Sequence, residues 1–287
     1  MQMPECLPRV TSVTGVVLDA RSRGSTGAEG TDLTLGVNGE HLEALAFSDD
    51  ELWRWRLVVP VVAETFGLIH TPGMPRPIIT LACPAASAAV LRHLPDSLCP
   101  VAGIVSGTRR LVDAIGATPL RRFVESVFAR RDVHDLYWTL PASIAHHHAY
   151  PGGLAVHSLE VACDIATQST LTGTERDLGI AAALLHDIGK VWSYDGRRLT
   201  RAASAMGHEL LGLTRLEPAL SRLEHAWEDG ALAMRVLLSG QARRRPDGSY
   251  PYALVQRLRA CDQRSAECAR HTGASRAGRA WAPVPCV

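Results

Sequence analysis

One histidine–aspartate pair and one lysine lie within five residues of each other and could act together in catalysis. His186 and Asp187 precede Lys190 in the string Leu-Leu-His-Asp-Ile-Gly-Lys. Lys190 is the only lysine, since 29 of the 30 lysines and arginines are arginine. Imidazole and carboxylate can share one cation, and a compact ammonium differs chemically from an arginine fork. The string therefore predicts a metal-binding or catalytic element. The alternatives are a chance lysine and a buried hydrogen-bonded pair.

Three further elements carry side chains that can bind metal. The internal run His146-His147-His148 precedes a Pro-Gly-Gly turn, and His157 follows in the helix that this turn opens. Asp262 lies in an apolar-to-basic helix, and His208 belongs to a Gly-His-Glu string before it. Taken singly, such residues are more often core histidines or salt-bridge carboxylates. Together they favour a metal site.

The order of these residues resembles that of the HD-domain metal phosphohydrolases. The resemblance covers roughly residues 118–270, and the Leu-Leu-His-Asp-Ile-Gly-Lys string is its most recognisable part. It implies that His157, His186, Asp187 and Asp262 ligate a divalent metal on a helical bundle. The mixed nitrogen and oxygen ligands suit Mn²⁺, Fe²⁺ or Zn²⁺ better than Mg²⁺.

Two subgroups of this superfamily are similar in more detail. The histidine triplet and the string Cys-Asp-Gln-Arg-Ser at 261–265 resemble the HD domain of MobH-type conjugative relaxases. A β-rich segment ahead of the helices is similar to the YhaM-type 3′→5′ exoribonucleases, in which an OB-fold precedes the HD domain. The chain is short for a full relaxase, which favours a relaxase-related stand-alone protein.

One position departs from the pattern of two-metal HD enzymes. Where those enzymes carry a further histidine, this chain reads Leu-Leu-Ser239-Gly240-Gln241. His208 matches the other histidine of the second metal. The second site is therefore expected to be weak, unless His147 or His148 completes it or contacts phosphate instead.

Composition narrows the setting of the protein. A net charge of +1 gives no global reason to expect a polyanionic partner, although arginines cluster locally, as at 243–245. The seven cysteines form no Cys-x-x-Cys pair, which predicts reduced thiols and a cytoplasmic location. Neither a signal peptide nor an apolar run of about 18 residues is visible, so no membrane association is expected.

The hydrophobic pattern changes its period near Pro84. Short runs rich in Val, Thr and Leu come first, with a hairpin signal at Asn38-Gly39, and helical spacing follows. The sequence thus predicts an α+β protein. A small β-barrel or sandwich, possibly OB-like, should occupy residues 1–83. An all-helical HD-type bundle should occupy residues 84–271 and a flexible tail residues 272–287.

Three functions fit these observations. The first is a metal-dependent phosphodiesterase or nuclease acting on single-stranded DNA or RNA, with the β-domain binding nucleic acid by stacking on Trp53 or Trp55. The second is a nucleotide phosphohydrolase, and the third is a non-catalytic, metal-stabilised binding module. Lys190 and Asp187 are the expected catalytic residues. Arg264 and His146 are candidates for substrate binding.

Overall fold

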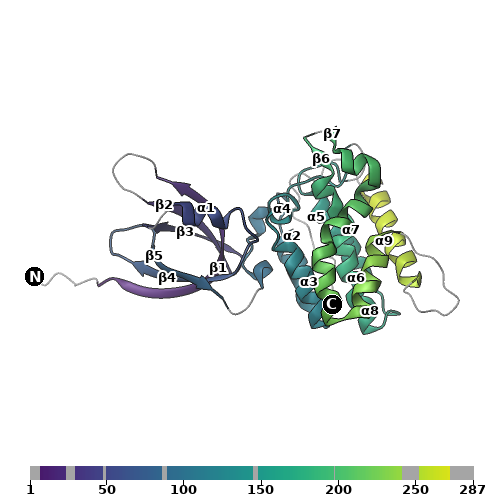
Figure 1. Cartoon of the computed structure of the whole chain (residues 1–287), viewed down its shortest axis with the longest axis horizontal. Coiled ribbons are helices and arrows are strands. Elements are labelled where there is room, and N and C mark those ends of the chain that lie inside the picture. Colours follow the sequence, from purple (N-terminus) through teal and green to yellow (C-terminus); the bar gives the residue numbers. More distant parts are fainter. Residues whose placement is uncertain are drawn as a thin grey trace, which may run out of the picture. The chain divides into compact units, whose positions relative to one another are not determined.

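The computed structural model divides into two compact units, and it describes residues 7–23, 30–47, 50–85, 89–144, 148–196, 198–240 and 252–271. The first unit runs to Pro95 and includes Phe128–Arg131, and the second contains Asp96–Val127 and the chain from Asp132. Strands dominate the first unit and helices the second (Figure 1). This arrangement confirms the predicted α+β fold class.

A closed five-stranded barrel forms the first unit. Its strands follow the order β1-β2-β3-β5-β4, and β4 pairs with β1 to close the sheet. All neighbours are antiparallel except β3 and β5, which run parallel at Leu45 and Ile78. The strands span β1 (Arg9–Ser22), β2 (Thr31–Val37), β3 (Glu40–Ala46), β4 (Glu64–His70) and β5 (Ile78–Pro84).

Alternating apolar side chains fill the barrel. Leu33 and Leu35 of β2 point inward and are fully buried, as expected for a strand with one face on a core. The short helix α1 (Asp50–Arg56) connects β3 to β4 within the segment that the sequence predicts to be a β-rich domain. Trp53 of this helix belongs to the barrel core, where the Arg56 guanidinium lies 4.7 Å from its ring centre. Only Trp55 is left exposed for stacking.

Helices make up most of the second unit. Before the candidate site come η2 (Asp96–Leu98), α2 (Ile104–Ala114), α3 (Thr118–Phe128) and α4 (Arg131–Leu136). A 3-10 turn, η1 (Val90–Arg92), precedes them in the first unit. The chain continues with α5 (Gly153–Ala166), α6 (Gly173–Leu185), η3 (Ile188–Trp192), α7 (Arg201–Ala226), α8 (Glu228–Leu238) and α9 (Tyr252–His271). A two-residue hairpin, β6 (Tyr194–Asp195) and β7 (Arg198–Leu199), separates η3 from α7.

Two apolar helices form the centre of this unit. Helix α5 packs against α6, α9 and α2, while α7 packs against η3 and α8. Most residues of α5 and α6 are buried, so these helices present apolar side chains on nearly all sides. A capping box between Thr172 and Glu175 fixes the start of α6 by satisfying two backbone donors. Among the described residues, no helix is both long and apolar enough to cross a membrane.

Candidate metal centre

The sequence-predicted ligands come together at one point of the helical unit. His157 lies in the second turn of α5, His186 and Asp187 lie at the end of α6, and Asp262 lies in α9. Ligand atoms of His157, His186 and Asp187 all lie within 4.8 Å of one another. The Nε2 atom of His157 is 3.0 Å from Asp262 Oδ1 and 3.6 Å from Asp187 Oδ2. His186 Nε2 lies 3.6 Å from Asp187 Oδ2 and 3.7 Å from Asp262 Oδ1.

The His186 ring is held by its own helix. Its Nδ1 atom is 2.8 Å from the Ala183 carbonyl oxygen, and a carbonyl only accepts, so Nδ1 carries the proton. The lone pair on Nε2 consequently faces the two carboxylates. This nitrogen is buried and makes no hydrogen bond to any of the described residues. A lone pair directed at carboxylate oxygens is repulsive unless a cation or a proton lies between them.

The pKa shifts of His186 and Asp187 also indicate that a positive charge is favoured between these side chains. Burial lowers the pKa of His186, but Asp187 and Asp262 outweigh it and hold that pKa above its usual value. Burial raises the pKa of Asp187, yet His186, Lys190 and His208 hold it well below its usual value. His157, which is fully buried, has a lowered pKa because desolvation dominates. Imidazole nitrogens and carboxylates around one point are a donor set that fits a divalent transition metal.

Lys190 and His208 bind the two oxygens of one carboxylate. The Lys190 ammonium lies 2.5 Å from Asp187 Oδ2, one turn along the chain in η3. His208 Nε2 lies 2.9 Å from Asp187 Oδ1. Asp187 therefore joins the ligand cluster on one side to His208 on the other.

A close backbone approach brings His208 to this position. A Cβ atom on Gly189 would lie 1.8 Å from the His208 carbonyl oxygen, so only glycine permits the contact between η3 and α7. Helix α7 is kinked just before His208, where Gly207 has φ of 77°. Two glycines of the predicted motifs thus explain why a residue 21 positions after Asp187 reaches its carboxylate.

Gly240 stands where two-metal HD enzymes carry a histidine, and its neighbours show which side chain is near that position. A Cβ atom on Gly240 would have Glu209 Cγ as its neighbour, at 3.8 Å. The Glu209 carboxylate also lies 3.5 Å from His208 Nδ1. Glu209 therefore lies beside the position at which the resemblance to two-metal HD enzymes implies a histidine. Sequence reasoning missed Glu209, although it directly follows His208.

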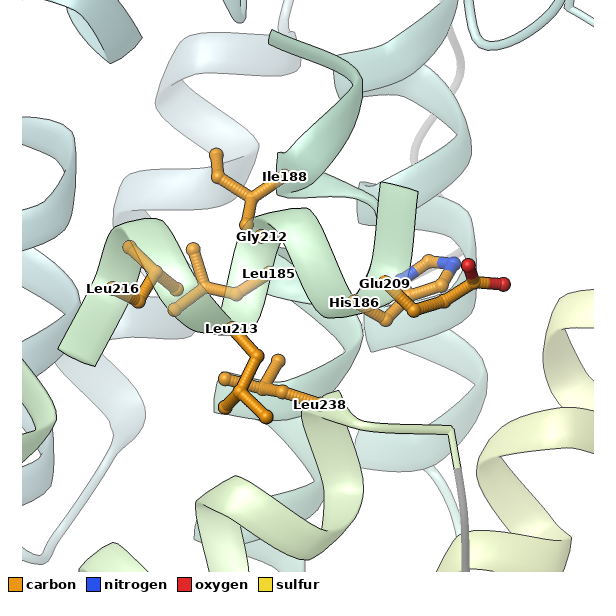
Figure 2. Close-up of a pocket in the computed structure, with 8 residues that line it drawn as sticks. All are labelled: Leu185, His186, Ile188, Glu209, Gly212, Leu213, Leu216 and Leu238. Carbon is orange, nitrogen blue, oxygen red and sulfur yellow. The ribbon is translucent and has the colours of Figure 1, made fainter. Parts of the chain in front are cut away.

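A small recess lies next to His186, one of the candidate ligands. It has about 140 Å³ of empty space and is lined by His186, Glu209 and aliphatic side chains of α6, η3, α7 and α8. Figure 2 shows the His186 ring and the Glu209 side chain together at one side, with the leucines at the other. Side chains leave essentially no room inside it for a water molecule, so this recess does not hold a nucleotide.

The histidine triplet is only partly described. His146 and His147 lie outside the described residues. His148 is 5% exposed and lies behind His157, with ring centres 5.4 Å apart. Its Nε2 atom is 3.3 Å from Glu160 Oε2, and its Nδ1 is 2.9 Å from the Tyr150 hydroxyl. These contacts favour a supporting role for His148 over the predicted contact with phosphate or a second metal.

The remaining candidate, Arg264, pairs with a carboxylate outside the cluster of ligands. Its side chain is 70% exposed and pairs with Asp164 at 3.1 Å. Sequence reasoning did not single out Glu160, which contacts Ser265 from the opposite helix. The available signal was spacing, since Glu160 and Ser265 each follow a predicted ligand by three residues and so share its helix face.

Comparison with known families agrees with this geometry. Residues 154–266 match the family described as "HD domain". Residues 111–193 match the TraI_2 family, described as "Putative helicase". Both matched segments contain His157, His186, Asp187 and Lys190. No curated protein matches the chain. The first match supports assignment of the helical unit to the HD superfamily, whose members are generally metal-dependent phosphohydrolases.

Proposed function

We propose that this protein is a metal-dependent phosphodiesterase that cleaves single-stranded nucleic acid. The observation that carries the proposal is the convergence of the buried His157 and the partly buried His186 with Asp187 and Asp262, in the residue order of an HD domain. These four side chains are the proposed ligands. The cation supplies Lewis-acid stabilisation of phosphoryl oxygens and activation of water. The donor set favours Mn²⁺, Fe²⁺ or Zn²⁺ over Mg²⁺.

Lys190 is the proposed stabiliser of the charge that develops on the phosphoryl group. Its ammonium contacts the carboxylate of Asp187, which is one of the proposed ligands. Together with His186 and His208, it also lowers the pKa of Asp187. A compact ammonium with three rotatable donors can keep one bond to Asp187 and offer another to a non-bridging oxygen.

His208 and Glu209 are the proposed groups for a second cation or for a substrate phosphate. His208 shares the Asp187 carboxylate, and Glu209 is the neighbour of Gly240. Because glycine stands at position 240 and the neighbouring Glu209 side chain is half-exposed, we expect the second cation to bind weakly. His146, His147 and Arg264 remain candidates for contact with the nucleic acid.

The nucleic-acid substrate is supported by the "Putative helicase" match and by the barrel. The strand order of this closed barrel, with a helix between β3 and β4, supports an OB-like domain, and OB-folds commonly bind single strands. We infer a relaxase-related role from the similarity of the histidine triplet and of the segment around Asp262. Exposed Trp55 is the proposed stacking residue of the barrel, because Trp53 is in the core.

A second candidate is a nucleotide phosphohydrolase, and the barrel's charges favour it. Four arginines of the barrel pair with its own carboxylates: Arg21 with Asp19, Arg23 and Arg76 with Asp32, and Arg56 with Glu64. Paired arginines contribute less to phosphate binding, which depends on cations that neutralise the backbone. A small anionic substrate needs no such surface.

One digestion series separates these candidates. Purified protein is stripped of metal, supplied with Mn²⁺, and incubated with end-labelled single-stranded DNA, single-stranded RNA, duplex DNA and mononucleotides. We expect cleavage of a single strand, no cleavage without metal, and none by Asp187→Ala. Turnover of mononucleotides alone would favour the second candidate. A folded, metal-loaded protein that acts on none of these substrates would contradict both and favour a binding module.

A further inference from the structure

A chain of hydrogen bonds runs from His157 of α5 through Ser265 of α9 to Glu160 of α5. His157 Nδ1 is 3.0 Å from Ser265 Oγ, and Ser265 Oγ is 2.8 Å from Glu160 Oε2. Glu160 lies on α5 with His157, whereas Ser265 lies on α9 with Asp262. Both contacts are on the Nδ1 side of the His157 ring, away from the ligand cluster, since Nε2 faces Asp187 and Asp262.

The chemistry of these groups gives each hydrogen bond a direction. A carboxylate only accepts, so the hydroxyl proton of Ser265 is donated to Glu160. Ser265 has no second proton, and its oxygen must accept from His157 Nδ1–H. That tautomer leaves a lone pair on Nε2, which is the form of histidine that binds metal.

His148 contacts Glu160 and Ser265 at the end of this hydrogen-bond chain. Its Nε2 atom lies 3.3 Å from Glu160 Oε2 and 3.4 Å from Ser265 Oγ. It can donate to Glu160 while its Nδ1 accepts from the Tyr150 hydroxyl at 2.9 Å. The loop reaches this place because Gly153 lets the backbone pass closely, since a Cβ there would lie 2.0 Å from the His148 carbonyl oxygen.

The two candidate histidine ligands therefore donate their Nδ1 protons to different kinds of hydrogen-bond acceptor. His186 uses the Ala183 carbonyl of its own helix, which no side-chain substitution removes. His157 depends on side chains from two helices. This difference allows the effect of the Glu160–Ser265 pair to be measured, with His186 as the internal reference.

We propose that Glu160 and Ser265 are positioning residues, which hold His157 in the tautomer and ring orientation that present Nε2 to the metal. His148 supports Glu160 in this arrangement. The inference rests on the proposed metal site and does not depend on which substrate is cleaved. Such outer contacts to a metal-binding histidine typically change metal affinity by about 10–100-fold.

The first test reads the tautomer directly in the metal-free wild-type protein. Two-dimensional ¹⁵N correlation spectra of the histidine rings, assigned with His157→Gln and His186→Gln, distinguish Nδ1–H from Nε2–H. We expect both His157 and His186 as Nδ1–H. A neutral His157 with its proton on Nε2 would overturn the proposal, whether or not the protein hydrolyses any substrate.

The second test measures Zn²⁺ affinity against a competing chelator. Ser265→Ala is expected to bind Zn²⁺ about 10–100-fold more weakly than wild type. Ser265→Thr, which keeps the hydroxyl, should retain most of the affinity. Ser126→Ala is the matched control, because Ser126 donates only to its own helix at Phe123. The unfolding temperature in chelator shows that each variant is folded.

These outcomes distinguish positioning from a general structural role. If Ser265→Ala is folded, binds Zn²⁺ like wild type and keeps His157 as Nδ1–H, the proposal is wrong. If Ser265→Ala does not fold, the tautomer of the wild-type protein and the affinity of Ser265→Thr decide instead. Weak Zn²⁺ binding by the wild-type protein itself would contradict the metal site, and the ring spectra would still report on the positioning chain.

Discussion

The carboxylate of Asp187 bonds through one oxygen to His208, with Oδ1 2.9 Å from Nε2. Its other oxygen, Oδ2, faces His157 and His186 at 3.6 Å each. The single side chain thus connects a buried cluster of three ligand residues with a half-buried histidine on another helix. A carboxylate in this position can bridge two cations, or orient a phosphate contact beside one.

Binding of the cation should stabilise the folded protein, because the four ligands converge only after folding. Free metal at about 100 times its Kd adds about 2.7 kcal/mol to the free energy of unfolding. Unfolding temperatures with and without Mn²⁺ or Zn²⁺ measure this increase. His186→Ala should lose it, whereas exposed His225→Ala should keep it. Equal shifts in both variants would place the bound metal elsewhere.

Substitution of Lys190 should lower kcat while metal content stays unchanged. Lys190→Ala removes the ammonium beside Asp187, and Lys190→Arg should restore little activity because a fork does not reproduce a point charge. Steady-state kinetics and elemental analysis of the same preparations provide the test. Arg222→Ala, an exposed change of charge on α7, is the control. Full activity of Lys190→Ala would exclude its catalytic role.

Activity should depend on added metal, and that dependence should involve His208 and Glu209. His208→Ala and Glu209→Ala are both expected to weaken the rise of kcat with Mn²⁺ concentration, because the two residues adjoin Asp187 and Gly240. Glu228→Ala, at the exposed start of α8, should behave like wild type. Two tightly bound metals per purified chain would instead indicate a complete second site.

Acid should destabilise the metal-free protein in part through Asp187. The folded pKa of Asp187 lies well below its ordinary value of 3.8, so the unfolded chain takes up this proton first. The carboxylate therefore contributes stability above about pH 4, and the contribution is lost as pH falls through the folded pKa. Denaturant unfolding in chelator between pH 6 and pH 3 measures the slope. Asp187→Asn should flatten it, and an unchanged slope would contradict the electrostatic description.

The sequence predicted the fold class because it depends on local patterns, and the four candidate ligands, which the resemblance implied, lie near one another in the structure. Period-2 runs before Pro84 became the barrel, and the spacing of His157 and His186-Asp187 within apolar helices placed them on packed faces. Helix α1 was missed because its Trp and Arg residues have no strong helical period; the buried Trp53 and the ion pair of Arg56 with Glu64 hold it against the barrel.

Local sequence patterns could not predict the hydrogen bonds that link His157, Ser265 and Glu160. Glu160 and Ser265 are 105 residues apart, and their contact exists only because α5 packs against α9. Likewise, nothing near His148 in the sequence shows that its ring contacts Glu160 and not a metal or a phosphate. Such contacts depend on the relative rotation of two helices, which no single helix specifies.

The central claim is that His157, His186, Asp187 and Asp262 bind one divalent cation. Crystals grown with Mn²⁺, with data collected at the manganese absorption edge, test it most directly. The account predicts an anomalous peak roughly 2.0–2.3 Å from Nε2 of both histidines and from an oxygen of each aspartate. Ordered side chains without such a peak, or a peak bound by other residues, would contradict it.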